Sequence, residues 1–83
     1  MLLTIIVPVY NEEATVEKAL ERLLDVSLEG VRREVIVVND GSTDSTKARL
    51  AQFLPQVVFL EHQRNLGKGA ALRTGLLRAS GDV

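Results

Sequence analysis

The polar residues best suited to chemistry stand directly after apolar segments. The segment Asn39-Asp40-Gly41-Ser42-Thr43-Asp44 follows the apolar run Val35–Val38. A carboxylate at the end of a buried strand is costly unless it faces water or a ligand. Ionised Asp40 is an acceptor-only group, so it suits an N–H of a nucleobase or a ribose hydroxyl. The segment also fits an ordinary turn whose side chains cap a helix, and the local pattern leaves both interpretations open.

The basic residues gather in the second half of the chain. Residues 1–44 hold nine acidic and four basic residues, whereas residues 45–83 hold two acidic and six basic ones. The charged residues between Glu61 and Asp82 are all basic: Arg64, Lys68, Arg73 and Arg78. Such a stretch attracts phosphate, although it equally describes a solvated helix face. Nucleic acid is not an expected partner, because the net charge is −1 and only 4% of the residues are aromatic.

Two familiar phosphate-binding motifs are excluded by the residues around Gly67-Lys68-Gly69. A dinucleotide-binding fingerprint requires a third glycine where the chain has Leu72. A Walker A loop requires Ser or Thr after its lysine, where the chain has Gly69. Phosphate recognition by this loop would therefore follow another pattern.

Metal and nucleophile chemistry are not supported by the histidine, cysteine and serine content. The chain has one histidine, His62, and no cysteine, and a single histidine makes a poor metal site. We expect His62 to have a structural role at a strand end. Ser42 lacks the Gly-x-Ser-x-Gly frame of a nucleophile elbow.

The elements that must position these residues alternate between strand and helix. Unbroken aliphatic runs predict buried strands, and apolar residues three and four apart predict helices. The expected strands cover residues 2–9, 35–38 and 57–60, and the expected helices cover 12–25, 45–54 and 70–79. Pro8 should end the pairing of the first strand because it has no N–H. Asn11 suits the N-cap of the first helix.

This βαβαβα order predicts an α/β fold, a three-layer Rossmann-like parallel sheet with right-handed crossovers. Ligands of such sheets bind at the carboxyl ends of the strands, where residues 8–12, 39–44 and 61–68 would converge. The 83 residues form one small domain. The longest apolar run ends at Val9, far short of the ~18 residues that a membrane span needs.

Three blocks of sequence stand out along the chain: Thr4 to Glu13 (TIIVPVYNEE), Glu34 to Thr46 (EVIVVNDGSTDST) and Asn65 to Gly75 (NLGKGAALRTG). In this order and spacing they resemble family-2 glycosyltransferases of the GT-A fold. Together they span the whole chain, which looks like the amino-terminal portion of such an enzyme. The last block leans toward the branch of dolichol-phosphate and polyprenyl-phosphate glycosyltransferases. In that family the strand order is 3-2-1.

The resemblance implies a nucleotide-sugar site for a UDP- or GDP-linked donor. By similarity, Pro8, Tyr10 and Glu12 line the nucleoside pocket, and Asp40 accepts the imide N–H of uracil or guanine. A carboxylate selects bases that carry this donor. Lys68 and Arg73 approach the diphosphate, helped by the backbone N–H groups at the start of the third helix. The implied nucleotide-binding residues are thus Pro8, Tyr10, Glu12, Asp40, Lys68 and Arg73.

The chain departs from the family's pattern at its carboxyl end. In the family, a stretch like Ala79 to Val83 leads into a fourth strand that ends in an Asp-x-Asp motif holding Mg²⁺ or Mn²⁺. The 83 residues contain no such motif, and Asp82 is not assigned as a metal ligand. We therefore expect residues 1–83 to be one partial domain, the nucleotide-sugar-binding half, with no catalytic or metal-binding residue of its own. We expect Mg²⁺ or Mn²⁺ in the complete enzyme and negligible turnover by the 83 residues alone.

In the family's sheet a fourth strand lies beside the first, so without that strand we expect the first strand to lie at an edge. Ile5, Ile6 and Val7 would lie there, and an apolar edge is a template for pairing with another chain. We expect self-association through this edge, or a requirement for the carboxyl-terminal half of the enzyme. A cytoplasmic location is expected, or the cytoplasmic face of a membrane for the complete protein.

Two alternatives belong to other functional classes. A binding module would keep the nucleoside pocket without the chemistry. An interaction domain of receiver or flavodoxin type would bind nothing of this kind. Receivers need an acidic cluster that includes an aspartate closing the third strand, where this chain has Glu61 followed by His62, so this last alternative ranks lowest.

Overall fold

The computed structural model describes residues 2–26 and 29–81 of the chain. Three parallel strands form one sheet in the order β1-β2-β3. The elements along the chain are β1 (Leu2–Val9), α1 (Val16–Asp25), β2 (Arg32–Asp40), α2 (Thr46–Leu50), the 3-10 turn η1 (Ala51–Phe53), β3 (Val58–His62) and α3 (Lys68–Arg78). The expected βαβαβα order and the strand order 3-2-1 are confirmed.

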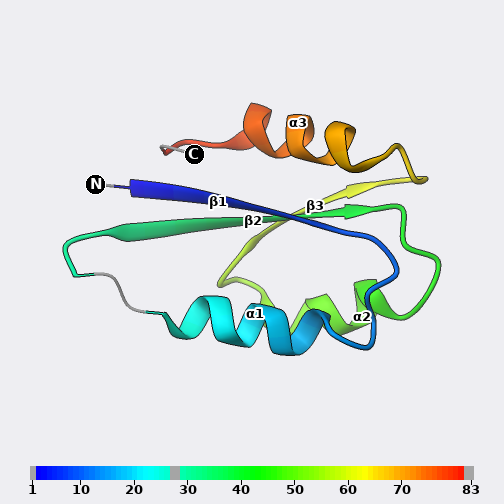
Figure 1. The fold of residues 1–83 in the computed structure, drawn as a ribbon, viewed down its shortest axis with the longest axis horizontal. Helices are drawn as coiled ribbons and strands as arrows, with labels where there is room; N and C mark the ends of the chain where they lie inside the picture. Colours follow the sequence, from blue (N-terminus) through cyan, green and yellow to red (C-terminus); the bar gives the residue numbers. More distant parts are fainter. Residues whose placement is uncertain (1, 27–28, 82–83) are drawn as a thin grey trace.

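Helices cover both faces of the sheet, which confirms the three-layer arrangement (Figure 1). The helices α1 and α2 lie on one face and α3 lies on the other. Alternate residues of β2 therefore enter different cores: Val35 and Val37 pack under α1 and α2, whereas Ile36 and Val38 pack under α3. Because β2 is central and covered on both sides, its apolar run is continuous.

The register of the strands corrects one prediction and brings two polar residues together. Pairing of β1 with β2 continues through Pro8 opposite Val38 to Val9 opposite Asn39, so Pro8 does not end it. A residue without an N–H is tolerated because β1 is an edge strand of this sheet. Asp40 is paired with His62 across β2 and β3, which places both side chains at the carboxyl ends of the strands.

The first helix begins later than the sequence predicts. Asn11 is not its N-cap: the helix starts at Val16, after Thr15, and Asn11 has a positive φ of 48°. The backbone N–H groups of Asn11 and Glu12 donate to the side chains of Ser42 and Thr46. These N–H groups are engaged by Ser42 in the loop after β2 and by Thr46 at the start of α2, so residues 11–13 stay outside the helix.

The other boundaries shift by a few residues. The expected second helix divides into α2 and the 3-10 turn η1, and α3 already starts at Lys68. The loop before α3 therefore ends at Gly67, whose φ of 99° suits a glycine at a helix start. Asp82 lies outside the described residues. Among the helices of residues 2–26 and 29–81, none is long and apolar enough to cross a membrane.

Candidate functional site

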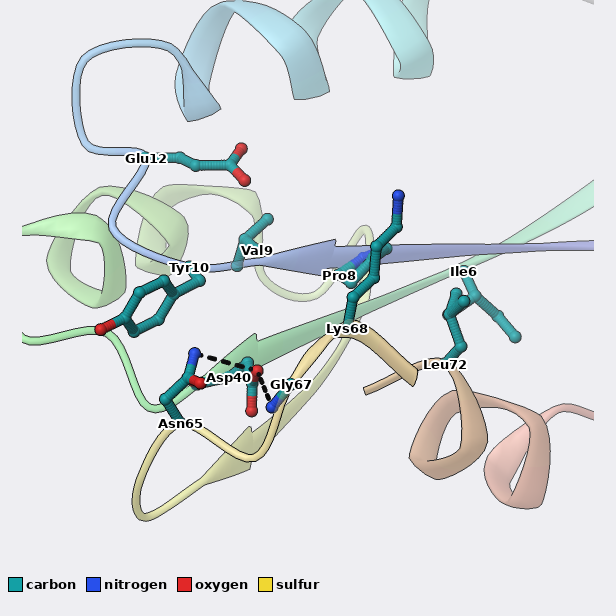
Figure 2. Close-up of a pocket in the computed structure, with 10 residues that line it drawn as sticks. All are labelled: Ile6, Pro8, Val9, Tyr10, Glu12, Asp40, Asn65, Gly67, Lys68 and Leu72. Atoms are coloured by element: carbon teal, nitrogen blue, oxygen red, sulfur yellow. Dashed lines mark hydrogen bonds between the residues drawn. The ribbon is translucent and has the colours of Figure 1, made fainter. Parts of the chain in front are cut away.

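A cleft of about 750 Å³ opens at the carboxyl ends of the strands. Its lining residues come from β1 and the loop after it, the end of β2, the loop after β3 and the first turns of α3: Ile6, Pro8, Val9, Tyr10, Glu12, Asp40, Asn65, Gly67, Lys68 and Leu72. In Figure 2, Tyr10, Asp40 and Asn65 lie toward one end of the cleft and Ile6 and Leu72 toward the other. The volume is typical of a small-molecule site.

Five of the six residues expected to bind nucleotide line this one cleft: Pro8, Tyr10, Glu12, Asp40 and Lys68. Arg73 is exposed on α3 and is not among the lining residues. An α-helix turns by about 100° per residue. Leu72, four residues after Lys68, therefore shares its side of the helix, whereas Arg73 points about 140° away from it.

Asp40 is the centre of a hydrogen-bond network that joins the end of β2 to the loop before α3. The residue is 3% exposed, and both carboxylate oxygens accept two hydrogen bonds. Oδ1 accepts from the N–H of Leu66 at 2.9 Å and faces Nδ1 of His62 at 2.7 Å. Oδ2 accepts from the N–H of Gly67 at 2.9 Å and from Nδ2 of Asn65 at 3.2 Å. The Asp40 carboxylate thereby fixes the loop that leads into α3.

These donors also decide the charge of Asp40. Burial alone would raise the pKa of its carboxyl group, but the hydrogen bonds from His62 and from the N–H groups of Leu66 and Gly67 outweigh burial and lower the pKa below its usual value. Asp40 is therefore an ionised, acceptor-only group at neutral pH.

His62 is held at both ring nitrogens. With the Asp40 carboxylate as acceptor, Nδ1 carries the donated proton, and Nε2 lies 2.7 Å from Oγ1 of Thr74 in α3. The structural role predicted for His62 at a strand end agrees with this geometry. Its specific partners, Asp40 and Thr74, were not predicted, since they lie 22 and 12 residues away in the sequence.

The loops after β1 and β2 are joined by reciprocal hydrogen bonds. The N–H of Asn11 donates to Oγ of Ser42, and Oδ1 of Asn11 accepts from the N–H of Thr43. The carboxylate of Asp44 accepts from the N–H of Thr46 and, more weakly at 3.4 Å, from that of Glu13. The turn-and-cap interpretation of residues 39–44 is thus correct for Asp44 and for Asn39, whose Oδ1 accepts from the N–H of Ser42. Ser42 and Thr43 instead hold the segment that carries the cleft residues Tyr10 and Glu12.

The loop after β2 also presses against the loop after β3. A Cβ atom on Gly41 would lie 2.2 Å from the carbonyl carbon of Arg64 and 2.5 Å from the nitrogen of Asn65. Gly41 also has a positive φ of 71°. Only glycine meets both conditions without displacing the backbone. This close approach keeps the N–H groups of the loop after β3, those of Leu66 and Gly67, within hydrogen-bond distance of Asp40.

The start of α3 supplies the positive side of the cleft. Lys68 is exposed at the first position of the helix, where backbone N–H groups carry a partial positive charge. Glu12 lines the same cleft. The cleft thus combines a cationic helix start with two carboxylates, those of Asp40 and Glu12. Apolar side chains, such as Ile6 and Leu72, line the rest of it.

A divalent metal does not fit the residues that the structure describes. No group of three or more His, Asp, Glu or Cys side chains among residues 2–26 and 29–81 is arranged to hold an ion. Asp40 already uses its oxygens for four protein donors.

Five lining residues were not assigned from the sequence: Ile6, Val9, Asn65, Gly67 and Leu72. Leu72 follows from helical spacing, because it lies one turn after Lys68. Asn65 and Gly67 stand within the third sequence block. They lie 25 and 27 residues after Asp40, so their contact with it depends on how the loop after β3 folds back.

Comparison with known proteins gives matches along nearly the whole chain. The family model "Glycosyl transferase family 2" matches residues 4–83. The dolichyl-phosphate beta-glucosyltransferase ALG5A of Trichomonas vaginalis is 34% identical over 98% of this chain and 28% of its own length. The poly-beta-1,6-N-acetyl-D-glucosamine synthase of Staphylococcus aureus is 34% identical over 96% of this chain and 19% of its own length.

A solved structure agrees with the fold. The mannosyltransferase PcManGT from Pyrobaculum calidifontis, in complex with GDP-Man and Mn²⁺, superposes with a TM-score of 0.78 at 34% identity. The match covers 95% of this chain and 24% of that protein. The chain therefore spans little more than a quarter of the length of these relatives, or less.

Proposed function

The chain belongs to glycosyl transferase family 2, and from this premise we propose that it is the nucleotide-sugar-binding portion of an enzyme that transfers a sugar to an acceptor. The observation that carries the proposal is the single cleft that gathers Pro8, Tyr10, Glu12, Asp40 and Lys68. The ligand we propose is a UDP- or GDP-linked sugar, since GDP-Man is bound by the similar mannosyltransferase. Residues 1–83 would then form one partial domain.

The nucleoside would lie between Tyr10 and Asp40. Tyr10 is 43% exposed at the cleft, and its ring offers a flat apolar surface to a base. Of the four donors to Asp40, Nδ2 of Asn65 is the most distant at 3.2 Å and comes from an exposed side chain. The imide N–H of uracil or guanine would take up this donor position. Adenine has no such N–H, so the pocket would discriminate against it.

The diphosphate would lie against the start of α3. The N–H groups at the helix start and the ammonium of Lys68 both favour an anion there. The side chain of Lys68 lines the cleft, whereas that of Arg73 does not. The geometry therefore supports Lys68 in this role more strongly than Arg73, which stays a prediction from the resemblance.

The molecule that accepts the sugar is a further part of the proposal. Relatives at equal identity include a dolichyl-phosphate glucosyltransferase and a polysaccharide synthase. A polyprenyl phosphate is the acceptor that we propose for the complete enzyme. A cytoplasmic location, or the cytoplasmic face of a membrane for a longer protein, stays a prediction as well.

We propose that the 83 residues alone bind the donor without turning it over. Neutralising the leaving diphosphate with a metal ion is worth several kcal/mol in such transfers, and the described residues offer no cluster to hold the ion. Sugar transfer or donor hydrolysis by the purified chain with Mn²⁺ would contradict this part of the proposal.

The open edge of β1 is the proposed surface for self-association. Within residues 2–26 and 29–81, β1 pairs only with β2. An unpaired apolar strand edge favours the addition of another strand, and we propose a second copy of this chain as the occupant. Light scattering of the isolated chain at increasing concentration should show a dimer, and a stable monomer would contradict it.

The binding proposal is tested by NMR titration of the isotope-labelled chain with UDP, GDP and ADP, with and without Mn²⁺. We expect UDP or GDP, but not ADP, to shift signals of residues 8–12, 38–44 and 65–68, with no dependence on the metal. No shift with any nucleotide in a well-dispersed spectrum would contradict a working pocket. Binding without turnover would distinguish the proposed portion of an enzyme from a complete one.

A matched pair of variants on α3 sharpens this test. Lys68→Gln removes the cation that lines the cleft, and Arg73→Gln removes an exposed cation on another side of the same helix. Since a charge-assisted hydrogen bond is worth about 1.5–3 kcal/mol when well formed, we expect UDP or GDP to bind about tenfold more weakly to Lys68→Gln. Arg73→Gln should change affinity by less than about twofold, and the reverse order would restore the assignment of Arg73.

A further inference from the structure

Two residues outside the cleft, His62 and Thr74, connect the end of β2 with α3. Nδ1 of His62 lies 2.7 Å from Oδ1 of Asp40, and Nε2 lies 2.7 Å from Oγ1 of Thr74. The side chain of His62 is 10% exposed and that of Asp40 is 4% exposed. Neither His62 nor Thr74 lines the cleft. The imidazole ring therefore spans the interior from the end of β2 to the middle of α3.

Asp40 also contacts the residues directly before α3. Asp40 accepts hydrogen bonds from the N–H groups of Leu66 and Gly67, the two residues directly before Lys68. The helix is thus fixed to Asp40 at its start and, through His62, at Thr74 in its second turn. Because the imidazole ring is rigid, it sets the distance between Asp40 and Thr74.

A carboxylate, a histidine and a hydroxyl in line also occur where a nucleophile is activated. That role does not fit here, because Thr74 does not line the cleft and its hydroxyl faces the ring of His62. Both ring nitrogens are engaged by protein groups. The arrangement is suited to holding elements in place and not to chemistry on a substrate.

Building on the proposed function, we propose that His62 and Thr74 are positioning residues for diphosphate binding. They fix where α3, which begins at Lys68, lies relative to Asp40. Loss of the contact between His62 and Thr74 would leave the nucleoside end of the cleft intact and loosen its phosphate end. The substrate feature that these residues serve is the diphosphate and not the base.

The test compares two substitutions of Thr74 in the whole chain. Thr74→Val keeps the shape but removes the hydroxyl, whereas Thr74→Ser keeps the hydroxyl and serves as the control. Affinities are measured by NMR titration for UDP and GDP and, separately, for uridine and guanosine. An intramolecular hydrogen bond contributes about 0.5–1.5 kcal/mol, so its loss weakens binding by about tenfold at most. We expect that loss for the diphosphates with Thr74→Val, less than about twofold change for the nucleosides, and wild-type values with Thr74→Ser.

Each other result has a definite meaning. Unchanged diphosphate affinity in Thr74→Val, or an equal loss for nucleosides and diphosphates, would overturn the positioning role and leave the proposed function standing. No binding of any nucleotide by the unaltered chain would overturn the proposed function and this inference with it.

A measurement on the unaltered chain covers the case in which Thr74→Val fails to fold. Coupling between two sites is reciprocal, so a diphosphate bound at the cleft should in turn stabilise the contact between His62 and Thr74. We expect UDP or GDP to shift the Nε2 signal of His62 and the amide signal of Thr74, and uridine or guanosine to leave both in place. Static signals on diphosphate binding would overturn the inference.

Discussion

The two faces of the sheet are packed in different ways. Under α1, α2 and η1 the helices contribute large buried side chains, and the core there contains Val9, Val16, Leu20, Val35, Val37, Leu50, Phe53 and Val57. Under α3 the helix contributes only small buried residues, Ala71 and Gly75, against Ile36 and Val38 of the sheet. The larger apolar residues of α3 point elsewhere, and Leu77 is 85% exposed.

Polar contacts replace bulk on the α3 face. Asp40 holds the N–H groups before the helix, His62 holds Thr74 in its middle, and Glu34 accepts hydrogen bonds from Ser80 just after it. Burial of apolar area is non-directional, whereas hydrogen bonds fix distance and angle. We infer that apolar burial on the α1 face contributes most of the stability, whereas the directional contacts on the α3 face fix the position of that helix. The helix that we propose to bind the diphosphate, α3, is therefore the one that these hydrogen bonds hold in place.

The largest effect is expected from removing bulk on the α1 face. Leu20 is 1% exposed, and replacing a buried leucine with alanine costs about 2–5 kcal/mol. A domain of 83 residues has only about 4–12 kcal/mol of stability at ~0.05–0.15 kcal/mol per residue. Leu20→Ala should therefore shift the urea midpoint strongly downward. Leu77→Ala, on α3, should stay within about 0.5 kcal/mol of wild type, and equal shifts would refute the contrast between the faces.

A smaller effect is expected from adding bulk on the α3 face. A Cβ atom on Gly75 would lie 2.5 Å from Cγ2 of Ile6. Overpacking of this kind costs about 1–3 kcal/mol, against a gain of up to ~1 kcal/mol from helix propensity. We expect Gly75→Ala to lose about 1 kcal/mol in urea unfolding. Gly69→Ala is the matched control, because nothing lies within 4 Å of its added Cβ.

The pair Gly75→Ala and Ile6→Ala decides whether the close approach is the cause. If the new methyl group collides with Ile6, the double variant loses less stability than the sum of the two single variants, because contacting residues are not additive. Strict additivity would place the cost of Gly75→Ala outside this contact.

The sequence predicted those parts of the fold that depend on local apolar pattern. The first strand was predicted from residue 2 to 9 and is observed as Leu2–Val9, since a nearly unbroken aliphatic and β-branched run ends there before Tyr10-Asn11. The layers follow from the alternation of strands and helices, and the strand order and five of the ten lining residues of the cleft came from the resemblance of three sequence blocks.

The remaining features could not be predicted because they depend on residues far apart in the sequence. Asn11 fits an N-cap by type, but its N–H donates to Ser42, 31 residues away. His62 is unremarkable by spacing, and only the register of β2 and β3 places it beside Asp40. Arg73 belongs to the right sequence block, yet the helix turns it away from the cleft. Tertiary contacts of this kind leave no periodic signal in the sequence.

The smallest effect is expected at the far end of α3, where Glu34 is bound at the surface. The side chain and the backbone N–H of Ser80, followed by the hydroxyl of Thr4, lower the pKa of Glu34 to about 2 from a usual value of 4.5. A lowered pKa means that the ionised carboxylate stabilises the fold. This contribution is complete above about pH 4.5 and is lost as the pH falls toward about 2.

Glu34→Gln isolates this contribution, because the other carboxylates still titrate in the variant. The difference in urea midpoint between wild type and Glu34→Gln should be largest at neutral pH and shrink as the pH falls from about 4.5 to about 2. Glu21→Gln, on the exposed side of α1, controls for the loss of one negative charge. A difference that is constant with pH would mean that Glu34 does not hold Ser80. The far end of α3 would then be held by the hydrogen bond from the N–H of Gly81 to Oγ1 of Thr4 in β1, and the contacts of Asp40 and His62 would fix the cleft end.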